Sequence, residues 1–252
     1  MKKITFSSIK GGTGKTTTSI LVANALASAG YRVLTIDMDI QNSMSFYYLD
    51  DADIIDQKNI AFALHAGNLD ANILESNYKG VDIIPSSFNL VDLRAMPVKK
   101  LSRLLEATEL PYDYLIIDSA PTYDNIVLNA LNASDLIISP SKTSQFDYKG
   151  LLFFQSKLLT ETEKLDNWKI LMTFSRDSRT ENPENLNNQY RQLFESTFDN
   201  ILPFRIPETT LVNRIIDARE VLSGAKLKQK LQSSIKELAG YIAETELVVE
   251  RW

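Results

Sequence analysis

Short apolar runs alternate with longer helical patterns along most of the chain. The runs are rich in β-branched residues and end at turn or polar residues, which is typical of strands; they cover residues 3–8, 32–37, 81–85, 113–118, 135–139 and 169–174. Between them, residues 16–29, 89–107, 124–133 and 145–165 have helical length and spacing. This alternation predicts an α/β fold, with a mostly parallel twisted sheet, helices on both faces and ligands at the carboxyl ends of the strands.

The remaining stretches are short or irregular. Residues 41–56 and 175–184 have no clear period and are predicted to be surface loops near the strand ends. The 252 residues suffice for one large hydrophobic core, and no linker or repeat divides them. We therefore expect a single domain over residues 1–252.

Composition narrows the possible chemistry. The chain has no cysteine, which excludes disulfides, thiolate zinc sites, iron–sulfur clusters and cysteine nucleophiles. His65 is its one histidine, which argues against a histidine-based metal site or a Ser-His-Asp triad. The formal net charge of -5 argues against a wholly basic nucleic-acid binder, so any DNA contact needs a local basic patch. No apolar run reaches the roughly 18 residues of a spanning helix, and no signal-peptide pattern is visible. We expect a cytoplasmic protein.

The strongest local signal is a glycine-rich loop between the first predicted strand and the first predicted helix. Its residues are Lys10, Gly11, Gly12, Thr13, Gly14, Lys15, Thr16 and Thr17. Glycines let backbone N–H groups converge on phosphate oxygens, Lys15 can reach the β and γ phosphates, and the Thr16 hydroxyl can ligate Mg²⁺. The usual phosphate-loop pattern would need glycine at Ile9, and a second lysine, Lys10, follows instead.

Carboxylates end two of the predicted strands. Asp37 and Asp39 stand two residues apart at the end of the second strand, so they share one side in extended geometry. Asp118 ends an apolar strand. Magnesium and an attacking water need carboxylates that face the phosphate loop, and these three are the candidates.

The segment from Lys10 to Thr17 resembles the deviant Walker A motif of the ParA/MinD family of P-loop ATPases. The resemblance implies dimers with ATP sandwiched between the protomers, with Lys10 crossing to the nucleotide of the partner. A lysine delivered in this way would stabilise charge on the transferring phosphoryl group, as an arginine finger does.

The resemblance also implies roles for the carboxylates. Asp39 would be needed for hydrolysis, Asp37 would belong to the magnesium-side network near Thr16, and Asp118 would hold a magnesium-bound water. Ile40 replaces the proline that this segment usually has in the family, a departure that bears on the shape of the loop after Asp39.

Adenine recognition is expected after the last strands of the sheet. The resemblance points there to three nucleotide-binding residues, which are Phe174, Arg176 and Pro207. A plain loop role is the alternative for each of them.

Two features bear on the branch of the family. The missing cysteines exclude the branches that bind clusters, zinc or arsenic. The apolar stripe of the last helix precedes an acidic tail with Glu244, Glu246 and Glu250, so we expect this stripe to pack on the core of the protein rather than on an anionic membrane.

The only clear basic segment spans residues 201–236. It has seven basic and three acidic residues, a balance of 7 - 3 = +4. The candidate DNA-binding residues in it are Arg205, Arg214, Arg219, Lys226, Lys228 and Lys230. A solvated helix face is the alternative reading.

These observations predict a ParA-type switch. Mg²⁺ and ATP would close a homodimer that binds nonspecific DNA and so associates with the nucleoid. Hydrolysis, stimulated by a ParB-like partner, would release it. Because the phosphate loop starts at residue 10, we expect no helix-turn-helix before it. A MinD-like or other positioning ATPase, and a metabolic P-loop enzyme, remain the alternatives.

Overall fold

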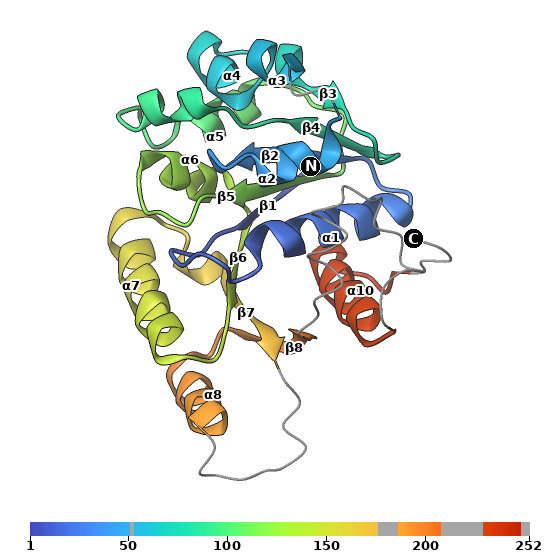
Figure 1. The fold of residues 1–252 in the computed structure, drawn as a ribbon. Coiled ribbons are helices and arrows are strands. Elements are labelled where there is room, and N and C mark those ends of the chain that lie inside the picture. The colour runs from blue at the N-terminus through green and yellow to red at the C-terminus, as the bar shows by residue number, and fades with distance from the viewer. Residues whose placement is uncertain (51–52, 176–185, 208–228, 248–252) are drawn as a thin grey trace.

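A computed structural model describes residues 1–50, 53–175, 186–207 and 229–247. The strands described there form one sheet in the order β3-β4-β2-β5-β1-β6-β7-β8 (Figure 1). All neighbouring strands in it are parallel except β3, which runs antiparallel to β4. The strands are β1 (Lys2–Phe6), β2 (Val33–Met38), β3 (Leu74–Glu75), β4 (Val81–Ile84), β5 (Tyr114–Ser119), β6 (Leu136–Ser141), β7 (Trp168–Ser175) and β8 (Ile201–Pro207).

Helices cover both faces of this sheet. The described α-helices are α1 (Lys15–Ser28), α2 (Ser43–Tyr48), α3 (Asp53–Gln57), α4 (Ile60–Ala66), α5 (Lys100–Ala107), α6 (Asn125–Ala133), α7 (Gln145–Glu161), α8 (Leu186–Thr197) and α10 (Gln229–Ala243). Three short 3₁₀ helices are η1 (Asp70–Asn72), η2 (Phe88–Leu93) and η3 (Leu165–Asn167). On one face α1 and α10 share a core with α2, and on the other α4, α5, α6, α7 and α8 enclose two further apolar clusters (Figure 1).

The predicted fold class is confirmed. All six predicted strands are present, with ends shifted by a few residues. The central strands β2, β5 and β6 are buried along their whole length, as expected for a parallel sheet covered on both sides. The prediction missed β3, which has two residues, and β8. Pro203 and Pro207 obscured β8 in the sequence, because proline lacks the N–H group of a strand ladder and is found mostly on edge strands, and β8 lies at one edge of the described sheet.

Two local predictions were wrong. The helix expected over residues 89–107 is divided into η2 and α5, because Pro97 lacks an N–H group and disfavours helical backbone at the preceding residue. The loop expected over residues 41–56 contains α2 and α3 instead, and Tyr47 and Tyr48 of α2 are buried. Of the other loop expected, residues 176–184 lie outside the described residues.

The apolar stripe near the C-terminus packs on the protein itself, as expected. Leu231, Ile235, Leu238 and Ile242 of α10 are buried in the same core as α1. Within the described ranges, no helix combines the length and apolar character that crossing a bilayer requires.

Candidate nucleotide-binding site

The phosphate loop lies where the parallel sheet predicts it, between the carboxyl end of β1 and the start of α1. Gly12 and Gly14 have φ angles of 69° and 95°, a conformation that side chains disfavour. A Cβ atom on Gly14 would also lie 3.1 Å from the ring of Phe174. The positive φ therefore favours glycine at position 14, directly before the N-terminus of α1, and a side chain there would also force the Phe174 ring to shift.

Lys15 is buried inside this loop. Its Nζ donates a hydrogen bond to the backbone oxygen of Lys10 at 3.2 Å. Burial lowers the pKa of the Lys15 ammonium, and the nearby charges of Asp118 and Asp39 act in the opposite direction. The loop thus holds a poorly solvated cation that a phosphate oxygen would stabilise.

Asp118 at the end of β5 faces the first turn of α1. The Thr16 hydroxyl donates to Oδ2 at 2.6 Å, and the Ser19 hydroxyl donates to Oδ1 at 3.3 Å. Burial, and then repulsion from Asp37, raise the pKa of Asp118 to about 8. A hydroxyl beside a carboxylate fits Mg²⁺, which is usually held by one or two carboxylates, waters and the phosphates of a nucleotide.

Asp37 lies directly beside Asp118, because the two are register partners on β2 and β5. Its Oδ1 accepts the N–H of Asp39 at 3.0 Å, and its Oδ2 accepts the N–H of Ser45 at 2.9 Å and the Ser45 hydroxyl at 2.7 Å. Burial raises the pKa of Asp37 to about 6. Through these bonds its carboxylate fastens the start of α2 to the end of β2.

Asp39 starts the turn that leads into α2. Its Oδ1 accepts the N–H of Gln41 at 3.0 Å, and its backbone oxygen accepts the N–H of Asn42 at 2.9 Å. Asn42 has a φ of 55°, and asparagine is among the few residues other than glycine that tolerate it. Ile40 packs against an apolar cluster on one face of the sheet, which gives this turn an anchor without proline.

Lys10 is bound within its own chain. Its Nζ lies 2.7 Å from Oδ2 of Asp147 and 3.5 Å from the Ser144 hydroxyl. Ser144 caps the N-terminus of α7, and Asp147 lies in the first turn of that helix. The resemblance to the family had led us to expect this lysine to reach a partner, and the contact with Asp147 was not anticipated.

Two of the expected adenine-binding residues lie at the carboxyl ends of β7 and β8. Phe174 has a φ of 52°, unusual for a bulky residue, and its ring lies against Gly14. Lys142, which sequence reasoning missed, places its Nζ 4.5 Å from the centre of that ring. Pro207 is brought near because it pairs with Ser175. Arg176 lies outside the described residues.

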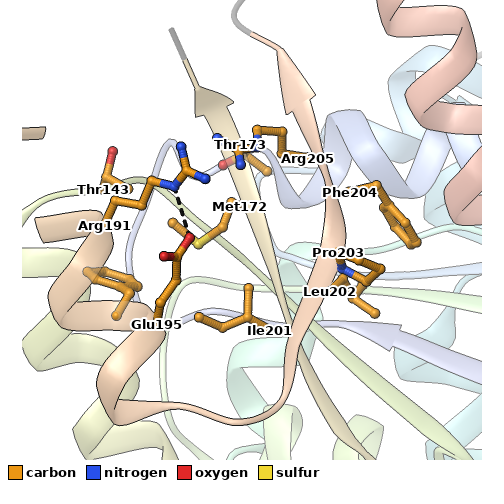
Figure 2. Close-up of a pocket in the computed structure, with 11 residues that line it drawn as sticks. Thr143, Met172, Thr173, Arg191, Glu195, Ile201, Leu202, Pro203, Phe204 and Arg205 are labelled. Carbon is orange, nitrogen blue, oxygen red and sulfur yellow. Dashed lines mark hydrogen bonds and ion pairs between the residues drawn. The ribbon is translucent and has the colours of Figure 1, made fainter. Parts of the chain in front are cut away.

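Of the six candidate DNA-binding residues, the structure describes Arg205 and Lys230. Arg205 on β8 lines a cavity of about 310 Å³, shown in Figure 2. On the opposite wall Arg191 and Glu195 of α8 form an ion pair at 2.9 Å. Lys230 is exposed on α10, across the sheet from α8 (Figure 1). The other candidates, Arg214, Arg219, Lys226 and Lys228, lie outside the described residues.

The sheet order, the phosphate loop and the contact between Thr16 and Asp118 define the class of the protein, which is a P-loop nucleotide-binding protein. The AAA_31 family model, described as an AAA domain, matches residues 1–170. The chain belongs to this family, and it is a P-loop ATPase of the ParA/MinD type.

Individual relatives agree with this assignment. The sporulation initiation inhibitor protein Soj of Bacillus subtilis is 33% identical over 157 residues, and the maintenance of carboxysome distribution protein A of Synechococcus elongatus is 29% identical over 171 residues. Each match covers 60% of this chain and 62% of the relative, so the chain spans under two thirds of their length. A solved plasmid partition protein of Borrelia burgdorferi, bound to AMPPNP, is 28% identical, with a TM-score of 0.73 over 96% of this chain and 97% of that protein.

Proposed function

We propose that this chain is a partition ATPase, a switch that alternates between an ATP-bound homodimer on nonspecific DNA and a released state. The single observation that carries the proposal is the phosphate loop, in which two lysines, Lys10 and Lys15, precede a threonine bonded to a buried carboxylate. One lysine suffices to bind the β and γ phosphates, whereas a second lysine suits delivery of a cation to a neighbouring protomer.

Each residue of the site would have a separate role in ATP hydrolysis. The loop amides and Lys15 bind the phosphates, and Thr16 with Asp118 would hold Mg²⁺, which neutralises charge on the phosphate oxygens when it is bound. Asp39 would orient the attacking water, since its Oδ1 is fixed by the N–H of Gln41. Lys10 of the second protomer would stabilise the charge that develops on the transferring group.

Three observations favour partition of DNA as the role of this chain. They are the similarity to Soj, the similarity to the Borrelia plasmid partition protein and the basic segment over residues 201–236. A ParB-like protein would stimulate hydrolysis, and the chain would be cytoplasmic and bound to the nucleoid in its ATP state. The name of the Synechococcus relative supports a second candidate, in which the same cycle positions a protein assembly.

The test is ATP-dependent binding to random duplex DNA at two salt concentrations, with the dimer followed by light scattering. We expect binding that requires ATP and weakens steeply with salt.

The Lys15→Ala variant should lose nucleotide binding, and Asp39→Ala should remain dimeric and bound to DNA. If the chain forms the ATP-dependent dimer but does not bind DNA at low salt, the positioning role is favoured. If Asp39→Ala hydrolyses ATP at the rate of the parent chain, the proposed role of Asp39 is refuted.

A further inference from the structure

The second lysine of the phosphate loop is held by a small polar site on its own subunit. Lys10 Nζ approaches Asp147 at 2.7 Å, and the Ser144 hydroxyl donates to the same carboxylate oxygen. The side chain of Asp147 is 1% exposed, whereas that of Lys10 is 39% exposed. The anion is therefore fixed in the protein, and the cation is the partner that can leave.

Helix capping alone does not account for this arrangement. The cap of α7 is made by the Ser144 hydroxyl, which accepts the N–H of Asp147 at 3.2 Å. The other carboxylate oxygen of Asp147, Oδ1, is buried and has no hydrogen-bond partner among the described residues. Buried carboxylate oxygens are rarely left in this way, so the carboxylate has capacity for a cation beyond what the cap requires.

Asp147 tolerates the departure of Lys10. It lies in the first turn of α7, where the partial positive charge of the helix N-terminus stabilises a carboxylate. The pair can therefore open without leaving an uncompensated negative charge in an apolar site.

Nucleotide binding provides a route to open the pair. The Lys15 ammonium donates to the backbone oxygen of Lys10, so the two lysines are linked. Phosphates that attract the Lys15 ammonium would break this bond and free the backbone of the loop at Lys10. The Lys10 ammonium cannot donate fully to Asp147 and to a second nucleotide at the same time.

We propose that Asp147, together with Ser144, is a positioning site that retains Lys10 on its own subunit and thereby sets the protein concentration at which the nucleotide-bound dimer forms. The inference rests on the proposed function, in which Lys10 acts across the dimer. It adds a competition between two anions, the carboxylate of the same chain and the phosphates of the partner.

The test compares Asp147→Asn with the parent chain in AMPPNP and Mg²⁺, with dimer formation followed by sedimentation velocity. We expect the concentration for half-dimerisation to fall by about three- to tenfold, because each of the two protomers loses one partly exposed ion pair. Binding of ADP to the monomer should not change. Asp147→Glu keeps the carboxylate and should restore the parental value.

The matched control is Glu161→Gln, which removes the same charge from the same helix. Glu161 pairs with Lys157 near the end of α7, so this variant should dimerise as the parent does. If Asp147→Asn unfolds, Asp147→Ser is the second variant, because it keeps a short polar side chain in the first turn. It should lower the concentration for half-dimerisation in the same way.

Failure of this inference can be distinguished from failure of the proposed function. If a folded Asp147→Asn chain dimerises at the parental concentration or less readily, the retention of Lys10 by Asp147 is refuted. If Lys10→Ala dimerises as well as the parent, the proposed role of Lys10 across the dimer fails, whatever Asp147 does.

Discussion

Asp37 and Asp118 are neighbouring buried carboxylates that receive different kinds of hydrogen bond. Asp118 accepts from the hydroxyls of Thr16 and Ser19, which can rotate and become acceptors. Asp37 accepts from the Ser45 hydroxyl and also from the backbone N–H groups of Asp39 and Ser45, which can only donate. The same substitution by asparagine should therefore have opposite effects at the two positions.

Asp118→Asn is expected to stabilise the nucleotide-free chain. The pKa of Asp118 is about 8 in the fold, above its ordinary value of 3.8, so its contribution to stability is complete below pH ~4 and is lost as the pH rises through 8. At pH 8 we expect the variant to gain about 1–3 kcal/mol in the free energy of unfolding, with a smaller gain at pH 5. Urea unfolding at both pH values measures it, and hydrolysis should be lost.

Asp37→Asn is the matched comparison. The pKa of Asp37 is raised less than that of Asp118, to about 6 rather than about 8, so the substitution relieves less buried charge here. Only the oxygen of an amide accepts hydrogen bonds, so one of the two backbone N–H groups loses its acceptor, at a cost of about 1–3 kcal/mol. Urea unfolding at pH 8 should show a loss. Equal stabilisation of both variants would mean that relief of buried charge outweighs the hydrogen bonds to α2.

Gly14→Ala is expected to destabilise the chain and to prevent nucleotide binding. The φ of 95° opposes a side chain, and so does the Phe174 ring, which would lie 3.1 Å from the new Cβ atom. We expect a loss of about 1–3 kcal/mol in the free energy of unfolding. Gly11→Ala is the control for stability, because nothing lies within 4 Å of its Cβ position. Thermal unfolding of the two variants should differ clearly; equal melting temperatures would contradict the constraint at Gly14.

At the scale of elements, the features that could be predicted from the sequence are those determined by residues close together in the chain. The strands, α1 and the phosphate loop follow from spacing within a few residues, and the parallel order then brings Asp118 to Thr16. The contact of Lys10 with Asp147 joins residues 137 positions apart, so no local pattern could predict it. Pro97 was a visible sign that the helix over residues 89–107 must break.

The helix α2 shows the same limit. Its residues 43–48 are too few to show a repeating helical pattern of apolar positions. Tyr48 is nevertheless buried, and its hydroxyl donates to Oδ1 of Asn24 in α1 at 2.8 Å. The Asn24 amide in turn donates to the Tyr47 hydroxyl at 3.2 Å. This buried polar network, absent from any short-range pattern, couples the phosphate-loop helix to the segment that follows Asp39.

Tyr48→Phe is expected to weaken the attachment of α2. The change leaves the Asn24 oxygen buried without its donor, at a cost of about 1–2 kcal/mol. Because Ser45 of α2 also bonds Asp37, we expect slower hydrolysis as well. Urea unfolding and ATPase rates measure the two effects. Tyr78→Phe, which removes the contact with the Ser28 hydroxyl nearer the surface, is the control; an equal loss there would contradict a specific role for the network.

At the scale of the whole molecule, charge is unevenly distributed. The chain has a net charge of -5, while the segment over residues 201–236 is basic. The fold divides the two described candidates in this segment between opposite sides of the sheet. Arg205 borders the cavity beside α8, and Lys230 lies on α10, which packs with α1 (Figures 1 and 2).

One duplex lying along one face of a protomer cannot use both side chains, so the two should respond differently to substitution. Lys230 is exposed on a helix, whereas Arg205 is partly enclosed by the cavity, and we expect Lys230 to be the phosphate contact. Lys230→Ala should lower the slope of log affinity against log salt by about one per protomer, with Arg205→Ala close to the parent. DNA titrations of the ATP dimer at several salt concentrations measure the slopes. The opposite ranking would place the DNA on the α8 side of the sheet, and an equal fall in both would require contacts that wrap around the β8 edge.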